Sequence, residues 1–248
     1  SYIIRNAHAV NHGEEPDLKT NRGDFFFLCR RAPERMVSTV VELCLTRLPE
    51  KMGIAPEDIQ VLTPTRKGEC GTVNLNRRLQ AALNPPARGK NEKQFGDLVF
   101  REGDRVMQTK NNYDVVWEKD DGTVGTGIFN GDVGTVEEID PSGELVTLRF
   151  DDRTAVYTAD LLGQLDMAYA ITVHKAQGSE YKAVVLLAAP AAPGLLVRGV
   201  LYTAMTRARE LLIMVGDDVI PGQMAVNDRR ARRYSGLRRR LKLGGINQ

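Results

Sequence analysis

The chain has 248 residues, of which 42% are hydrophobic and 27% are charged, and its formal net charge is +2. These fractions are ordinary for a globular protein, and the length allows one large domain or one domain that carries a small inserted one. The net charge is too small to indicate any partner by itself. No apolar run approaches the ~20 residues that a helix needs to span a bilayer, which argues against a membrane protein.

Three cysteines, Cys29, Cys44 and Cys70, are odd in number and form no CxxC pair. This pattern fits reduced thiols in a cytoplasmic protein better than a disulfide framework. The beginning of the chain lacks the charged and then apolar pattern of a signal peptide. Because the chain does not begin with methionine, we expect a fragment or a trimmed form of a longer protein.

The first part of the chain alternates between helices and strands. Pro33 opens one predicted helix, and Asn84-Pro85-Pro86 ends another. The β-α-β-α order indicates a parallel sheet that is covered by helices. The apolar periodicity predicts helices over 1–10, 33–48 and 72–83 and buried strands over 25–29 and 59–63.

The pattern changes near Gly96. Between Gly103 and Asp160, short β-type runs alternate with turn signals such as Asp121-Gly122 and Asn130-Gly131. Several short strands at this spacing predict a small antiparallel barrel. The predicted strands are 105–109, 115–117, 133–139, 145–150 and 155–158.

After Leu161 the alternation of helices and strands returns. We therefore expect one discontinuous α/β domain, 1–102 and 161–248, with the small barrel over 103–160 inserted in it. The predicted elements of this last part are a strand over 183–188, a helix over 200–210, a strand over 211–215 and a helix over 225–241.

Arginines crowd the end of the chain, from Arg229 to Lys242. Such a basic stretch either binds an anionic partner or forms a solvated helix face, and the residues alone leave both interpretations open.

Two kinds of site are missing from the sequence. A phosphate-binding P-loop needs GxxxxGK[ST], but the only Gly-Lys pair, Gly89-Lys90, is followed by Asn91. Metal sites have little support, and we expect none. Asp217-Asp218 follows a predicted strand but reads more simply as a turn. His8 and His12 have helical spacing, but no third ligand is evident.

Two segments carry groups that suit phosphate chemistry. The segment 168–181, AYAITVHKAQGSEY, concentrates hydroxyl, imidazole, ammonium and amide donors, and Gly178 would let the backbone approach a ligand closely. The segment 201–210, LYTAMTRARE, places Arg207 and Arg209 near the end of a helix. A fixed guanidinium can neutralise charge on a transferred phosphoryl group, but it can also compensate the helix dipole.

Together these segments resemble motifs V and VI of superfamily 1 helicases, and the match to the RecD-like branch (the exodeoxyribonuclease V alpha-subunit family) is close. The resemblance extends, in the family's order, to SYIIRNAHAVNHGEEPDL, VLTPTRKGECGTVNLNRRLQ, FREGDRVMQTKNNYDVVW, FNGDVGTVEEID and AVNDRRARRYSGLRRRL. It covers nearly the whole chain. It implies an α/β fold: a RecA-like parallel-sheet motor domain, the second of two, with an inserted small SH3-like antiparallel β-barrel.

The resemblance also implies roles in an ATP site. Arg207 aligns with the motif VI arginine that reaches the γ-phosphate across the cleft between the two motor domains. Gly178 and Glu180 align with motif V positions near the nucleotide, with Glu180 toward the ribose. The cofactors would be ATP and Mg²⁺, with the P-loop and the Mg²⁺ ligands in the first motor domain. The family's motif IV arginine is not in this chain.

Contacts with single-stranded DNA are implied at three places. Motif V supplies Thr172 and His174, and a loop at the end of a strand supplies Thr63, Pro64, Thr65 and Arg66. The inserted barrel lies along the strand path in the family, and Asn111 and Asn112 are the weaker expectations there.

The resemblance thus predicts the C-terminal half of an ATP-dependent DNA helicase of DNA repair and recombination, moving 5′→3′. The expected partners are single-stranded DNA, the N-terminal motor domain of the same protein and possible subunits of a recombination nuclease. The fragment alone should not hydrolyse ATP. The inserted barrel and basic tail leave an alternative open, a non-catalytic nucleic-acid-binding module. A self-sufficient phosphohydrolase is disfavoured by the missing P-loop.

Overall fold

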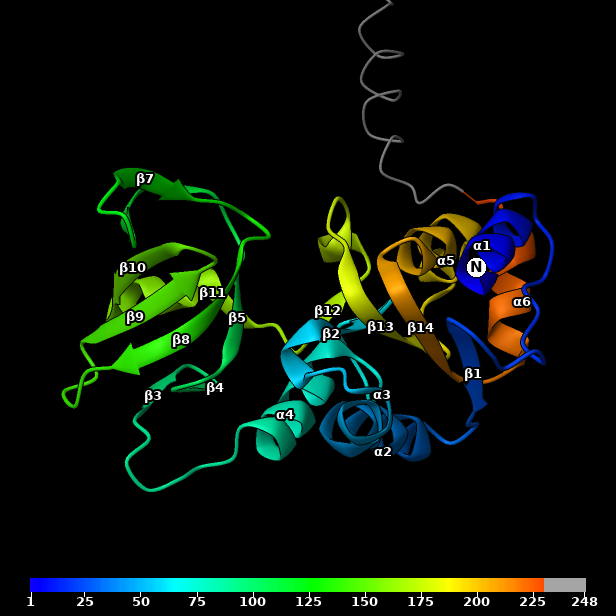
Figure 1. Ribbon diagram of the computed structural model, residues 1–248, viewed down its shortest axis with the longest axis horizontal. Helices are drawn as coiled ribbons and strands as arrows, with labels where there is room; N and C mark the ends of the chain where they lie inside the picture. The colour runs from blue at the N-terminus through cyan, green and yellow to red at the C-terminus, as the bar shows by residue number, and fades with distance from the viewer. Residues whose placement is uncertain (230–248) are drawn as a thin grey trace, which may run out of the picture. The chain divides into compact units, whose positions relative to one another are not determined.

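A computed structural model describes residues 1–229 of the chain, which divide into two compact units (Figure 1). The first unit comprises residues 1–36, 62–66 and the chain from Thr172 onward. The second unit comprises residues 37–61 and 67–171. None of the helices within residues 1–229 has both the length and the apolar character to span a membrane.

The first unit is built on a parallel sheet. Strand β14 (Ala208–Gly216) pairs in parallel with both β1 (Phe25–Cys29) and β13 (Tyr181–Ala188). The strand order of the sheet is β1-β14-β13-β2-β12, in which β2 (Ile59–Thr63) and β12 (Ala170–Thr172) each cross the limit between the two units. The central strands β13 and β14 are almost entirely buried, as expected of a parallel sheet that is covered on both faces. The four predicted strands of this sheet are confirmed.

Three helices belong to the first unit: α1 (Tyr2–Asn11), α5 (Arg198–Met205) and α6 (Val219–Val226). Helix α1 packs against α5, and α5 packs against α6, so the three lie together in Figure 1. The Asp24 carboxylate accepts hydrogen bonds from the Tyr2 and Ile3 N–H groups at 2.8 and 3.2 Å, which satisfies two otherwise unpaired donors of the first turn of α1.

The prediction of a helix over 200–210 is wrong at its end. Helix α5 stops at Met205, and β14 already begins at Ala208. The reason is long-range, because the Arg207 carbonyl accepts the Tyr181 N–H at 2.8 Å and so starts the pairing with β13. Most of the predicted helix over 225–241 is not tested. Helix α6 lies earlier, and the residues from 230 onward, with most of the basic tail, lie outside the described part of the chain.

The predicted helix over 33–48 is divided. Helix α2 (Pro33–Glu42) passes through a wider π-type turn, Leu43–Arg47, into α3 (Leu48–Met52). Pro49 has no N–H to donate back along the helix, and the wider turn precedes it. Gly53 ends α3 with a φ of 64°, which a residue with a side chain adopts at a cost. Helix α4 (Thr72–Leu83) has the predicted bounds.

The second unit contains a seven-stranded antiparallel sheet with the order β11-β5-β8-β9-β10-β6-β7, drawn in green in Figure 1. A separate hairpin, β3 (Glu92–Phe95) and β4 (Leu98–Arg101), precedes it. The sheet surrounds a core that includes Phe100, Phe150 and Tyr157. Its strands are β5 (Arg105–Gln108), β6 (Asn112–Lys119), β7 (Val124–Ile128), β8 (Val133–Ile139), β9 (Leu145–Phe150), β10 (Arg153–Thr158) and β11 (Leu165–Met167).

The five strands predicted for the insertion are confirmed, but four others were missed. Strand β7 reads Val-Gly-Thr-Gly-Ile, so glycines stand where alternating apolar side chains would have given a signal. Strand β11 is only three residues long and pairs with β5, which lies far from it in the sequence. The sheet therefore reaches Met167. The domain boundaries 1–102, 103–160 and 161–248 stay a prediction, since the two compact units follow other limits.

Candidate functional site

The two segments that resemble helicase motifs meet in the first unit at Arg207. Its guanidinium donates from Nη1 to the Ser179 carbonyl at 2.8 Å and from Nε to the Thr203 carbonyl at 3.1 Å. A third bond joins Nη2 to the Thr206 hydroxyl at 3.2 Å. Arg207 is therefore held between the end of α5 and the turn that leads into β13.

A guanidinium held in this way is suited to an anionic ligand. The three bonds to protein oxygens fix its orientation, and the group carries more than three N–H donors, so further hydrogen bonds stay available. The side chain is only partly buried. This arrangement allows Arg207 to meet a phosphate without first reorganising, which is the property that electrostatic catalysis requires.

The turn beside Arg207 leaves room for a ligand. Gly178 has a φ of +82°, and a Cβ added there would meet nothing within 4 Å, so one side of the turn is open. Glu180 is exposed at the start of the following strand. The predicted nucleotide-binding residues Gly178, Glu180 and Arg207 thus gather around one turn, and their character fits the phosphates and sugar of a nucleotide.

The predicted DNA-binding residues of the first unit also lie together. The Val173 N–H donates to the Thr63 carbonyl at 3.1 Å, which joins the loop 63–66 to the motif V segment. Along this loop the exposure rises, since Thr63 and Pro64 are buried and Arg66 is exposed. His174 lines a cavity of about 520 Å³, and Tyr202 lines the same cavity. The sequence analysis had not predicted Tyr202 as a site residue. Thr172 and His174 stand on either side of Val173 in the chain.

Two buried amides in the second unit were missed by the sequence analysis. Gln60 donates from Nε2 to the carbonyls of Ala168 and Tyr169 at 3.4 and 3.2 Å. Asn76 donates to the Ala170 carbonyl at 2.9 Å and accepts the Ala170 N–H at 2.8 Å. Together they hold the backbone that leads into motif V. For Gln60 the available signal was a lone polar residue in an otherwise apolar, buried run, whereas Asn76 has polar neighbours in α4 and gave no such signal.

Asn111 and Asn112 lie in the second unit, at the start of β6. Asn111 is exposed and Asn112 is half-buried, and both amide side chains take part in hydrogen bonds within the second unit. Their assignment as DNA contacts stays a prediction.

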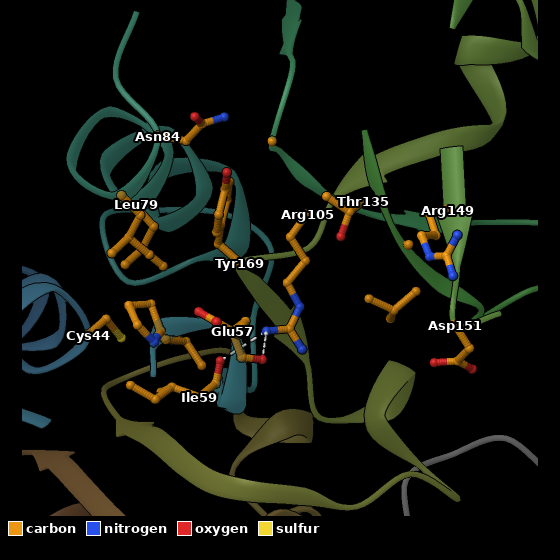
Figure 2. A pocket seen from close by; sticks show the side chains of 16 residues that line it. Cys44, Glu57, Ile59, Leu79, Asn84, Arg105, Thr135, Arg149, Asp151 and Tyr169 are labelled. Atoms are coloured by element: carbon orange, nitrogen blue, oxygen red, sulfur yellow. Dashed lines mark hydrogen bonds between the residues drawn. The ribbon is translucent and has the colours of Figure 1, made fainter. Parts of the chain in front are cut away.

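The second unit also contains a cavity of about 510 Å³, shown in Figure 2. Arg105 points into it and donates to the carbonyls of Glu57 and Ile59 at 3.3 and 3.1 Å, drawn as dashed lines. Burial raises the pKa of the Cys44 thiol, on the cavity wall, to about 12, so that this cysteine stays protonated and unreactive. None of the predicted site residues lines this cavity.

Among residues 1–229, no group of three or more histidine, cysteine, aspartate or glutamate side chains could hold a metal ion. The Asp217 carboxylate accepts the Val219 N–H at 3.1 Å, and Asp218 pairs with Arg31 at 3.4 Å, as expected of a turn after a strand.

Known proteins share both parts of this architecture. Residues 75–150 match the family model for the SH3 domain of ATP-dependent RecD-like DNA helicases, and residues 167–215 match that of the UvrD-like helicase C-terminal domain. The chain is 34% identical, over 97% of its length, to the ATP-dependent RecD2 DNA helicase of Deinococcus radiodurans. The chain belongs to the RecD-like helicase family. The RecD-like SH3 match runs from α4 to the end of β9, and the fold is a RecA-like α/β domain with an SH3-like insertion.

Other relatives extend the comparison. The RecD-like chain is 31% identical, over 76% of its length, to the RecBCD enzyme subunit RecD of Mycobacterium tuberculosis. It spans only 30% of the length of each of these two curated relatives. Among solved structures, Pif1 of Bacteroides bound to single-stranded DNA aligns with 98% of this chain and 54% of its own, at 17% identity and a TM-score of 0.49.

Proposed function

We propose that this chain is the C-terminal motor part of an ATP-dependent DNA helicase that moves 5′→3′ on single-stranded DNA during repair and recombination. The observation that supports this most directly is the joining of the Gly178 turn to Arg207, through the bond from Nη1 to the Ser179 carbonyl. The names of the relatives, RecD2 DNA helicase and RecBCD enzyme subunit RecD, support the same activity.

In the ATP site, Arg207 would contact the γ-phosphate from the side opposite to the P-loop. Because charge accumulates on the phosphoryl oxygens as the bond to the leaving group breaks, an arginine at this place can raise the rate ~10³–10⁵-fold. Gly178 would let the backbone approach the nucleotide, and Glu180 would face the ribose. Mg²⁺ would neutralise phosphate charge, with its ligands supplied by the N-terminal motor domain.

On the DNA side, Thr172 and His174 would contact the backbone of the strand, together with the loop Thr63–Arg66. Motif V carries nucleotide-binding residues, Gly178 and Glu180, as well as the DNA contacts Thr172 and His174. Closure of the cleft around ATP would therefore also move the DNA contacts. The partners of this chain would be single-stranded DNA, the N-terminal motor domain of the same protein and, in some assemblies, subunits of a recombination nuclease.

The test is ATP hydrolysis by the complete gene product, with and without single-stranded DNA. We expect stimulation by DNA, and we expect Arg207→Ala to reduce kcat by about 10³-fold or more. Arg209→Ala is the matched control, because Arg209 is an exposed arginine two residues away and should leave kcat near that of the wild type. His174→Ala should weaken the stimulation by DNA and leave ATP binding intact.

Turnover that is indifferent to DNA, or equal losses in the Arg207 and Arg209 variants, would contradict the proposal. A non-catalytic nucleic-acid-binding module would then be the better description, and DNA binding without any turnover would identify it. An equal loss of ATP binding and DNA stimulation in His174→Ala would count against the role given to His174.

A further inference from the structure

Two aromatic side chains of the second unit lie on the surface instead of in the core. Tyr113 is 67% exposed and Phe129 is 40% exposed, and their rings meet edge to face with centroids 5.5 Å apart. In the same sheet Phe150 and Tyr157 are fully buried. An exposed aromatic pair forgoes the free energy that burial would give, so it indicates a surface that contacts a ligand.

Neighbouring amides fix the start of β6, which carries Tyr113, and the loop after β7, which carries Phe129. The Asn111 Oδ1 accepts the Asn130 N–H at 2.9 Å, which ties the loop before β6 to the loop after β7. The Asn112 Nδ2 donates to Gln164 Oε1 at 3.0 Å. These hydrogen bonds therefore brace the start of β6 and the loop after β7.

The Phe129 ring is held in place by its own surroundings. The backbone N–H of Phe129 donates to Asp132 Oδ2 at 2.9 Å. The ring lies over Gly127, where an added Cβ would come within 2.8 Å of it. A ring that is already positioned loses little conformational entropy when a ligand binds, which favours affinity.

We propose that Tyr113 and Phe129 form a stacking platform for a base of single-stranded DNA, and that Asn111 and Asn112 position the two rings. The proposal rests on the helicase function proposed above and adds the kind of contact that the insertion makes. Aromatic rings accept any base, because every base has a flat π-face, so such a platform suits a protein that moves along a strand of any sequence.

The surroundings of the rings favour a base over a protein partner. The residues close to the rings in the sequence include the exposed polar residues Lys110, Asn111 and Asn130. A stable protein interface needs about 800 Å² on each side, far more than two rings within a polar border. Lys110 offers a cation to one phosphate, but the nearby exposed Asp114 offsets its charge, so stacking should carry most of the affinity.

The experiment measures binding of the nucleotide-free complete gene product to a dye-labelled oligothymidylate of about 16 nucleotides. Tyr113→Ala and Phe129→Ala should each weaken binding roughly 5- to 150-fold, the loss expected for one base stack. Tyr113→Phe keeps the ring and should bind within about twofold of the wild type. Val124→Ala is the matched control, because Val124 is a 63% exposed apolar residue of β7 outside the pair.

A second probe of the same length without bases separates stacking from phosphate contacts. On this probe the wild type and Tyr113→Ala should bind equally, and the salt dependence of oligothymidylate binding should be the same for both. Losses of equal size on both probes would overturn the stacking role. Binding of oligothymidylate by Tyr113→Ala and Phe129→Ala as tight as by Val124→Ala would overturn the proposal and leave the helicase function standing. Failure of the wild type to bind either probe would overturn both.

Discussion

Asp104 is fully buried, and its carboxylate accepts four hydrogen bonds within the second unit. The donors are Gln80 Nε2 at 2.7 Å, Asn84 Nδ2 at 2.8 Å, the Arg101 N–H at 2.7 Å and the Tyr169 hydroxyl at 2.8 Å. Burial and the charge of Asp104 raise the pKa of Tyr169, so its hydroxyl remains a donor. One carboxylate thus connects α4, β4 and the segment that leads into motif V.

Asp104→Asn should destabilise the chain, because an amide NH₂ would face groups that are themselves donors. We expect a loss of about 2–4 kcal/mol in the free energy of unfolding, measured by denaturant titration. Asp97→Asn, at an exposed position of the β3–β4 turn, is the control and should change stability by less than about 0.5 kcal/mol. Equal midpoints for the two variants would show that the four hydrogen bonds contribute little.

At the scale of the element, the β6–β7 hairpin depends on a glycine. A Cβ added at Gly125 would come within 2.3 Å of the Trp117 ring, which lies directly across the pair of strands. The cations of Lys119 and Arg153 lie 5.8 and 5.7 Å from the centre of the Trp117 ring. The hairpin therefore has a glycine where β propensity alone would favour a larger residue.

Gly125→Ala should lower the thermal midpoint of the chain, with a cost of about 1–3 kcal/mol for displacing Trp117. Gly199→Ala is the opposite case, because nothing lies within 4 Å of the added Cβ and the residue is in helix α5. It should raise stability by up to about 1 kcal/mol. Two variants that shift the midpoint in the same direction would contradict this account of the hairpin.

At the scale of the whole molecule, the proposed function gives this chain one side of an ATP site. It spans 30% of the length of the RecD2 DNA helicase of Deinococcus radiodurans, and its sequence contains no P-loop. In the proposed function, Arg207 would act on a phosphate that another part of the protein binds. The function of this chain is therefore expected to depend on the N-terminal motor domain.

These 248 residues alone should not hydrolyse ATP above the buffer background, while the complete gene product should do so under the same conditions. The measurement is phosphate release at equal protein concentrations, with single-stranded DNA present in both samples. Turnover by the isolated chain that disappears in Arg207→Ala would reverse this expectation and revive a self-sufficient phosphohydrolase.

The sequence by itself determined the elements with a strong apolar period. Strands β1 and β2 and helix α4 have the bounds that periodicity predicted. The pattern of buried positions in these elements follows from the order of apolar and polar residues that are neighbours in the sequence. It also indicated an antiparallel insertion and the residues around Gly178 and Arg207. Weak local signals failed, as in β7, whose glycines hide the alternation.

The tertiary structure decided what distant residues do together. The bond from Arg207 to the Ser179 carbonyl, the support of motif V by Gln60 and Asn76, and the end of α5 at Met205 all depend on segments far apart in the chain. The periodicity of apolar residues indicates which side chains are buried, but it does not indicate the hydrogen-bond partner of a buried polar group. A buried amide or guanidinium must find hydrogen bonds wherever the fold provides them, so only the folded chain assigns those contacts.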